Sequence, residues 1–187
     1  MSGNQDVTQM RIFPHPGMVL AVHTGGMFAE GIRIGSVLLD ETAAQNHILG
    51  ITHQDQKTLR WWGIEGRPGG VGWVDATPYL SSPVTVSNQR QPLDTRQQAG
   101  IVAALKLALG TPYDWEVIAE EAERDLHLKS TWSNTSAWGD TVPAHVICSS
   151  LLVWGYKRNG ADYPKNTDPG HEQPADWVQF INENNYA

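Results

Sequence analysis

The sequence predicts an α+β fold in which an antiparallel sheet comes first and helices follow. Two observations support this. Short apolar and β-branched runs separated by Gly, Pro and polar turns fill the first half of the chain, whereas the second half repeats apolar residues at helical spacing. Strands followed by helices are typical of α+β folds. The 187 residues, 40% hydrophobic and 18% charged, suit one globular domain over residues 1–187.

The predicted strands lie in the first half of the chain. GMVLAVHTG contains a continuous apolar run, and GIRIGSVLL alternates apolar and polar residues as a strand or a short helix. NHILGITHQ and TLRWWGIEG flank the polar turn QDQK and are expected to form a hairpin. A Gly/Pro turn then leads into a short strand, and PVTVSNQ is β-branched. The predicted regions are 17–25, 31–39, 46–54, 58–66, 71–74 and 83–89.

The predicted helices lie in the second half. Over residues 95–110 the apolar residues follow helical spacing, Thr95 is the expected N-cap, and Gly110 ends the pattern. Residues 113–128 form a second candidate helix. The C-terminal tail, 161–187, contains a short terminal helix entered through a proline. The last two helices are predicted from Ile147 or Cys148 to the Asn-Gly pair at 159–160, and over 174–185.

Composition narrows the classes of function. The formal net charge is −7 and the Lys and Arg residues are scattered, so nucleic acid is an unfavourable partner. A single cysteine excludes an internal disulfide and a cysteine-based metal site, and His47 with His53 lacks a carboxylate to complete a metal motif, so no metal or cofactor is expected. The chain has no apolar run of about 18 residues for a membrane span. Its polar N-terminus lacks the features of a signal peptide, so synthesis in the cytoplasm is expected.

The single cysteine, Cys148, stands where the third helix is expected to begin. A lone cysteine is most often a small buried hydrophobe. A helix N-terminus, however, carries partial positive charge and free N–H groups, which lower the pKa of a thiol and can hold a developing oxyanion. A thiolate nucleophile also needs a base that a third group orients. Cys148 is therefore a candidate nucleophile.

Among the seven histidines, His47 is the preferred base. It opens a predicted strand, and Glu65 lies on the partner strand of the hairpin, so the two side chains can orient one another while a helix on the sheet presents Cys148. His23 ends a strand and is an alternative base, whereas His145 is too close to Cys148 in sequence. Three further histidines are interpreted as solvated surface residues: His15, His127 and His171.

The order of these segments resembles the circularly permuted NlpC/P60 branch of the papain-like cysteine hydrolases, as found in YiiX/YaeF-like and lecithin:retinol acyltransferase-like groups. PGMVLAVHTG looks like the opening strand, NHILGI like the His motif, and IEGRPGGVGWVDATPYL like the segment that follows. LGTPYDW resembles a Gly-x-x-Tyr-Asp motif, and ICSSLLVWGY resembles the nucleophile helix. The resemblance covers most of residues 17–160. It implies a papain-like fold with the antiparallel sheet first and the Cys-bearing helix packed on it.

The resemblance also implies roles for particular residues. Cys148 would be the nucleophile, His47 the general base, and Glu65 the orienting third residue. Tyr113 would lie near the site and help to bind the reacting carbonyl, although an ordinary buried aromatic is an equal interpretation. The implied reaction is hydrolysis of an amide or ester through an acyl-enzyme, without a cofactor. The implied substrate is most often a stem peptide of the bacterial cell wall and sometimes a lipid.

A second class of function is open: a binding or structural component that keeps this fold without its chemistry. Residues 129–143 are rich in Ser, Thr, Trp and Gly and form an insertion directly before Cys148. This loop would be a substrate lid, a docking loop or a cover over the site. Trp132 and Trp138 would serve there as docking aromatics for a protein partner. A virion part such as a phage tail tip would reach a cell wall without a signal peptide.

Overall fold

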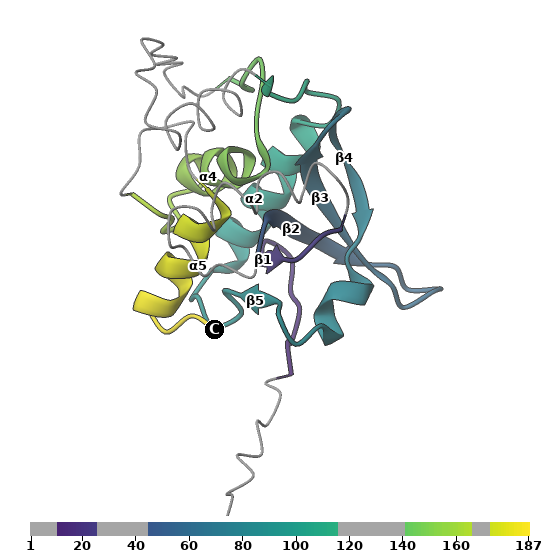
Figure 1. Cartoon of the computed structure of the whole chain (residues 1–187), viewed down its shortest axis with the longest axis vertical. Coiled ribbons are helices and arrows are strands. Elements are labelled where there is room, and N and C mark those ends of the chain that lie inside the picture. The colour runs from purple at the N-terminus through teal and green to yellow at the C-terminus, as the bar shows by residue number, and fades with distance from the viewer. Residues whose placement is uncertain (1–10, 26–44, 116–140, 166–172) are drawn as a thin grey trace, which may run out of the picture.

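The computed structural model describes residues 11–25, 45–115, 141–165 and 173–187 of the chain, and it confirms the α+β class. The described strands form an antiparallel sheet in the order β4-β3-β2-β1-β5. They are β1 (Val19–Val22), β2 (His47–Gln54), β3 (Trp61–Arg67), β4 (Gly70–Asp75) and β5 (Val86–Ser87). A 3₁₀ helix, η1 (Thr77–Ser81), follows β4. The helices are α2 (Thr95–Leu107), α4 (Cys148–Arg158) and α5 (Pro174–Glu183), which Figure 1 shows grouped against the sheet.

The hairpin predicted from the polar QDQK turn is formed by β2 and β3. The two strands pair antiparallel, with Gly50 opposite Ile64. Asp55 organises the turn, because one of its carboxylate oxygens accepts hydrogen bonds from the backbone N–H groups of Lys57 and Thr58. Because the two strands are antiparallel, the residue that begins β2 and the residue that ends β3 lie at the same end of the hairpin.

Strand β1 lies between β2 and β5 and is buried on both faces, which explains its continuous apolar run. Val19 and Ala21 pack into a cluster with the helices, whereas Leu20 and Val22 point into a second cluster on the opposite face. Helices α2 and α4 pack on the first face. The second cluster also includes side chains from η1 and from the segment before β1: Tyr79, Leu80 and Ile12.

Helix α2 is capped by a different residue from the one predicted. Asp94 is the N-cap: its carboxylate accepts from the backbone N–H of Gln97 at 2.7 Å, and the Gln97 side chain accepts from the backbone N–H of Asp94 at 3.0 Å. The prediction that Thr95 is the N-cap is therefore wrong. The physical reason is this reciprocal capping box, which pairs the N-cap with the residue three positions later.

A buried polar network ties α4 to the sheet. Asn88, which is fully buried, accepts from the backbone N–H of Val19 at 2.7 Å and donates to the hydroxyl of Tyr156 at 2.8 Å. The Tyr156 hydroxyl donates onward to the carbonyl of Gly17 at 2.6 Å. Burial raises the pKa of Tyr156 well above its usual range. This network joins β1, the residue that follows β5, and α4, and so helps to set the position of the helix.

We expect Asn88→Ala to lower the free energy of unfolding by roughly 2–3 kcal/mol, because it leaves the backbone N–H of Val19 buried without its acceptor. Urea denaturation followed by circular dichroism measures the change. The matched control is Asn184→Ala, which removes an exposed amide that donates to one carbonyl at the end of α5. A loss for Asn88→Ala no larger than for Asn184→Ala would contradict the proposed stabilising role of this network.

Several predicted segments fall outside the described residues. These include the strand or helix at 31–39 and most of the helix at 113–128. Nearly all of the insertion 129–143, with Trp132 and Trp138, also lies outside them. The predictions for these segments stay predictions.

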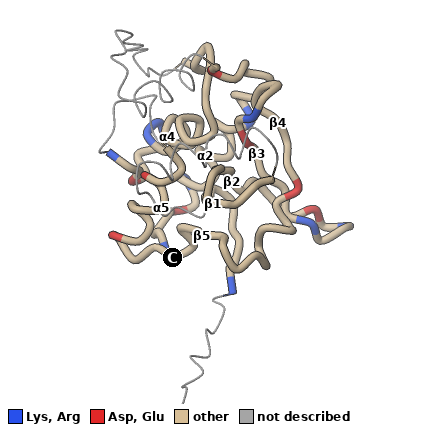
Figure 2. The backbone as a smooth tube through the Cα atoms, in the orientation of Figure 1, with Lys and Arg blue, Asp and Glu red and all other residues tan. Residues whose placement is uncertain are grey.

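Charge is dispersed over the described part of the chain. Figure 2 shows Lys and Arg interspersed with Asp and Glu along the tube, with no described segment where positive charge gathers. Two exposed ion pairs, Arg60–Asp75 at 2.7 Å and Lys165–Asp162 at 3.1 Å, are of the kind that contributes little to stability. Among the described helices, none combines the length and the apolar character needed to cross a membrane.

Candidate active site

Cys148 is the first residue of α4, where the sequence predicted a helix to begin. The preceding residue, Ile147, is extended, and its backbone N–H donates to the side chain of Ser150 at 3.0 Å. The Ser150 hydroxyl thereby satisfies the backbone N–H of Ile147 at the start of the helix. Cys148 is only 4% exposed. Because the first N–H groups of a helix have no partner within it, the thiol lies at the electropositive end of α4.

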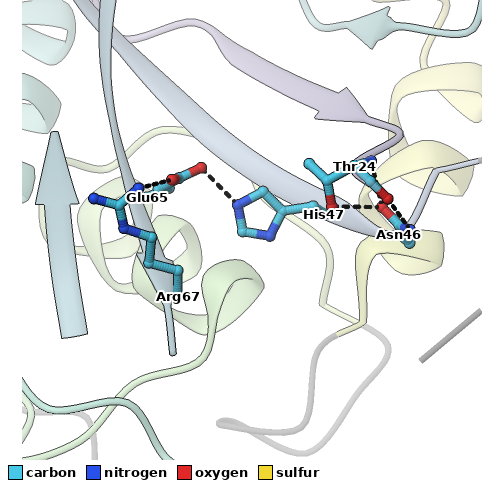
Figure 3. A network of polar contacts seen from close by, with 5 residues as sticks. All are labelled: Thr24, Asn46, His47, Glu65 and Arg67. Carbon is cyan, nitrogen blue, oxygen red and sulfur yellow. Dashed lines mark hydrogen bonds and ion pairs between the residues drawn. The ribbon is translucent and has the colours of Figure 1, made fainter. Parts of the chain in front are cut away.

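His47 is the first residue of β2, and its position is held by the residue before it. Asn46 accepts from the backbone N–H and the hydroxyl of Thr24 at 2.9 and 3.1 Å and donates to the Thr24 carbonyl at 3.0 Å (Figure 3). The backbone N–H of Asn46 also donates to the carbonyl of Val22 at 3.1 Å. These bonds fasten the start of β2 to the end of β1, so the backbone that carries His47 is fixed.

Glu65 lies beside His47, as the hairpin prediction required. Nε2 of His47 is 2.8 Å from one carboxylate oxygen of Glu65, and Figure 3 shows the ring facing that carboxylate. The other carboxylate oxygen accepts from Arg67 at 3.2 Å. Glu65 is buried, with 5% exposure, and each of its two oxygens has a partner.

The side chains of His47 and Cys148 interact through charge and a hydrogen bond, and each shifts the pKa of the other. Since Glu65 occupies Nε2, Nδ1 is the ring nitrogen that remains for the sulfur. The backbone N–H groups of Ile48 and Ser149 also bond to the sulfur. The structure thus brings three of the predicted site residues together in one connected chain: Cys148, His47 and Glu65.

The electrostatics of the pair favour its charged form. Burial by itself lowers the pKa of His47, but the charge of Cys148, its hydrogen bond and the contacts with Glu65 together raise the pKa of His47 to about 10. Burial likewise raises the pKa of Cys148, but the charge and hydrogen bond of His47, with the two backbone N–H groups, outweigh it and lower the pKa of the thiol. Opposite charges in a buried site stabilise each other. Thiolate and imidazolium are therefore the favoured forms.

The helix can approach the strands because a glycine lies at the contact. A Cβ on Gly66 of β3 would lie 3.3 Å from the backbone nitrogen of Cys148 and 3.3 Å from the carbonyl carbon and oxygen of Ile147. Gly50 of β2 has the same function farther along, since a Cβ there would lie 2.6 Å from a methyl group of Leu105 in α2. The missing side chains allow the backbone of the sheet and the start of α4 to touch.

Tyr113 lies next to the segment that leads into the nucleophile. It is buried and forms a parallel β-bridge with Val146, two residues before Cys148. Its ring makes an edge contact with Trp115 at 5.4 Å between centroids. Its bridge partner, not Tyr113 itself, is close to Cys148 in the chain, and the role of Tyr113 in binding a substrate carbonyl stays a prediction.

The other histidines of the described residues are not part of the connected chain. His145, His23 and His53 are exposed, and the ring of His15 lies 3.1 Å from the carbonyl of Pro16. Two further candidates lie outside the described residues: His127 and His171. Within the described part of the chain, His47 is thus the histidine that contacts Cys148.

Three contributors to the site were not predicted: Arg67, Gly66 and Asn46. The sequence does contain a signal for Arg67. It follows Glu65 by two positions in a strand, and side chains at that spacing point to the same face of the sheet. Gly66 and Asn46 had none, because their roles depend on which backbone segments touch in three dimensions.

In the described residues, His, Cys, Asp and Glu side chains do not gather in groups of three or more that suit a metal ion. The site offers a thiolate, an imidazolium, a carboxylate and backbone N–H groups, which together suit attack on a carbonyl. No family model, curated protein or solved structure matches this chain.

Proposed function

We propose that this protein is a papain-like cysteine hydrolase of the circularly permuted NlpC/P60 type that cleaves an amide or ester bond. The observation that carries the proposal is the hydrogen-bonded chain from Cys148 through His47 to Glu65, with the thiol at the start of a helix. A nucleophile, a base and a group that orients the base are what such a reaction requires.

The proposed reaction has two steps. The Cys148 thiolate attacks the carbonyl carbon, forming a C–S bond while the carbonyl electron pair moves to oxygen. The His47 imidazolium gives its proton to the leaving amine or alcohol as the C–N or C–O bond breaks. Neutral His47 then takes a proton from water as that water attacks the thioester carbonyl. The C–S bond breaks, the acid is released, and the thiolate–imidazolium pair is restored. Glu65 keeps the ring oriented in both steps.

The resemblance to the NlpC/P60 group implies a stem peptide of the cell wall as substrate, with a lipid as the alternative. A papain-like sheet and nucleophile helix would suit the observed order of strands and helices. A larger assembly such as a phage tail tip is the setting proposed for the second candidate function, described next. The insertion 129–143 is proposed as the contact with a protein partner.

A catalytically idle structural or binding component is the second candidate function. The observation that favours it is the 4% exposure of Cys148, since a buried thiol must become accessible before it can meet a substrate. The two functions differ in whether an acyl group is ever transferred to the sulfur.

Acyl transfer to Cys148 is the direct test. We expect a p-nitrophenyl ester, and then cell-wall peptides and lipid esters, to acylate the protein once, which intact mass measures cleanly because the chain has a single cysteine. We expect Cys148→Ala to lose the adduct and to slow product release about a thousandfold or more. A wild-type protein that accepts no acyl group from any of these compounds would contradict the hydrolase and favour the idle component.

A further inference from the structure

We propose that Arg67 is a positioning residue that holds the carboxylate of Glu65 in the orientation in which it meets His47. This inference rests on the proposed function and extends its site by one residue. Arg67 touches neither the thiol nor the imidazole in the contacts described above, so its effect passes through Glu65.

The first support is that Glu65 has a different partner on each oxygen. One oxygen is 2.8 Å from Nε2 of His47, and the other is 3.2 Å from a terminal nitrogen of Arg67 (Figure 3). A carboxylate held by one oxygen can turn about its last bond, whereas one held at both oxygens has a defined plane. The guanidinium, which stays charged at any ordinary pH, suits this role.

The second support is the surface on which the guanidinium rests. Gly72 of β4 lies opposite Glu65 in the sheet. A Cβ on Gly72 would lie 3.5 Å from a terminal nitrogen of Arg67 and 3.8 Å from its Nε, which is ordinary contact. The guanidinium of Arg67 therefore lies against the backbone of β4 at Gly72, while one of its terminal nitrogens donates to Glu65 on β3. The polar chain runs over three adjacent strands, from Arg67 beside β4 through Glu65 on β3 to His47 on β2.

The third support is the difference in burial along this chain. The side chain of Glu65 is 7% exposed and that of Arg67 is 53% exposed. A buried carboxylate needs compensating charge, and the half-exposed guanidinium provides it on the side away from His47. Among the described residues, two further titratable groups interact with this site: Cys148 from α4 and Tyr79 from η1. Burial raises the pKa of Tyr79, and the charge of Glu65 adds to that rise.

Two roles for Arg67 predict opposite effects on His47. If Arg67 were only a nearby positive charge, its removal would stabilise the imidazolium and raise the midpoint of the His47 titration. If Arg67 positions Glu65, its removal frees the carboxylate to turn, the imidazolium loses its oriented partner, and the midpoint falls. The sign of the change therefore identifies the role.

The experiment is an NMR titration of the His47 ring in the full chain labelled at histidine, with the signal assigned by its loss in His47→Gln. We expect Arg67→Gln to lower the midpoint by about one pH unit, in the same direction as Glu65→Gln. Arg67→Lys, which keeps a charge but not the planar fork, is expected to recover part of the loss. The matched control is Arg60→Gln, which breaks an arginine–carboxylate pair with Asp75 at the other end of β3 and β4 and should leave the midpoint unchanged.

An unchanged or raised midpoint in Arg67→Gln would overturn the inference. Arg67→Met provides the same readout if Arg67→Gln fails to fold. Failure of the proposed function is recognised separately, as a wild-type Cys148 that reacts no faster than an ordinary thiol and accepts no acyl group. The direction of the His47 change still decides the role of Arg67 in that case, because it is measured on the ring and not on turnover.

Discussion

Replacing His47 by alanine is expected to slow alkylation of Cys148 by iodoacetamide about a hundredfold at pH 6. The reason is the loss of the charge and hydrogen bond that lower the pKa of the thiol against the opposing effect of burial. An unperturbed thiol with a pKa of about 8.5 is roughly 0.3% ionised at pH 6, whereas a thiolate paired with an imidazolium is largely ionised. The rate is measured by intact mass on the single cysteine.

The direction of the pH dependence follows from the same interactions. In the wild type the lowered pKa of Cys148 keeps the thiolate present at lower pH than in an ordinary thiol, and rapid alkylation is lost as the pH falls through that lowered value. In His47→Ala burial still raises the pKa of the thiol, so the midpoint of the rate profile moves to higher pH. His145→Ala is the matched control, because His145 is exposed although it is close to Cys148 in sequence. Superimposable profiles for the wild type and His47→Ala would show that the two side chains do not form an ion pair.

Gly66→Val is expected to reduce the alkylation rate of Cys148 at pH 6 nearly to the level of His47→Ala. The added Cβ alone would lie 3.3 Å from the backbone of Ile147 and Cys148, and the two methyl groups reach farther. Backbone cannot swing aside as a flexible side chain does, so the start of α4 must shift away from β3 and carry the thiol away from His47. Overpacking of this kind also costs about 1–3 kcal/mol of folding free energy.

The control for this effect is Gly155→Ala on the same helix. A Cβ on Gly155 would lie 3.8 Å from a methyl group of Leu105, an ordinary contact, so alkylation should stay at the wild-type rate. Gly66→Ala is expected to have an intermediate effect, since it adds the Cβ without the methyl groups. A folded Gly66→Val protein that reacts as fast as the wild type would mean that this close approach does not position the nucleophile.

The elements of this fold were predictable where local sequence decides them. The apolar run of β1, the hairpin of β2 and β3, and the start of α4 at Cys148 all follow from patterns within about ten residues. The N-cap of α2 was predicted wrongly because two neighbouring residues, Asp94 and Thr95, are both good caps and only the bond to Gln97 distinguishes them. The strand at 83–89 is also shorter than expected, with β5 limited to Val86–Ser87.

The contacts of the candidate site also fall into those that local sequence predicts and those that it does not. Because strand neighbours in a hairpin are set by the turn, the sequence alone determined that His47 and Glu65 would lie close together, and it located Cys148 at a helix start. Only the tertiary structure decided that α4 meets the hairpin at Gly66, that Asn46 fastens the strand of His47, and that Arg67 binds the far oxygen of Glu65. Those contacts join segments that no local pattern connects, and they form because the buried sheet and helix pack at one particular distance and angle.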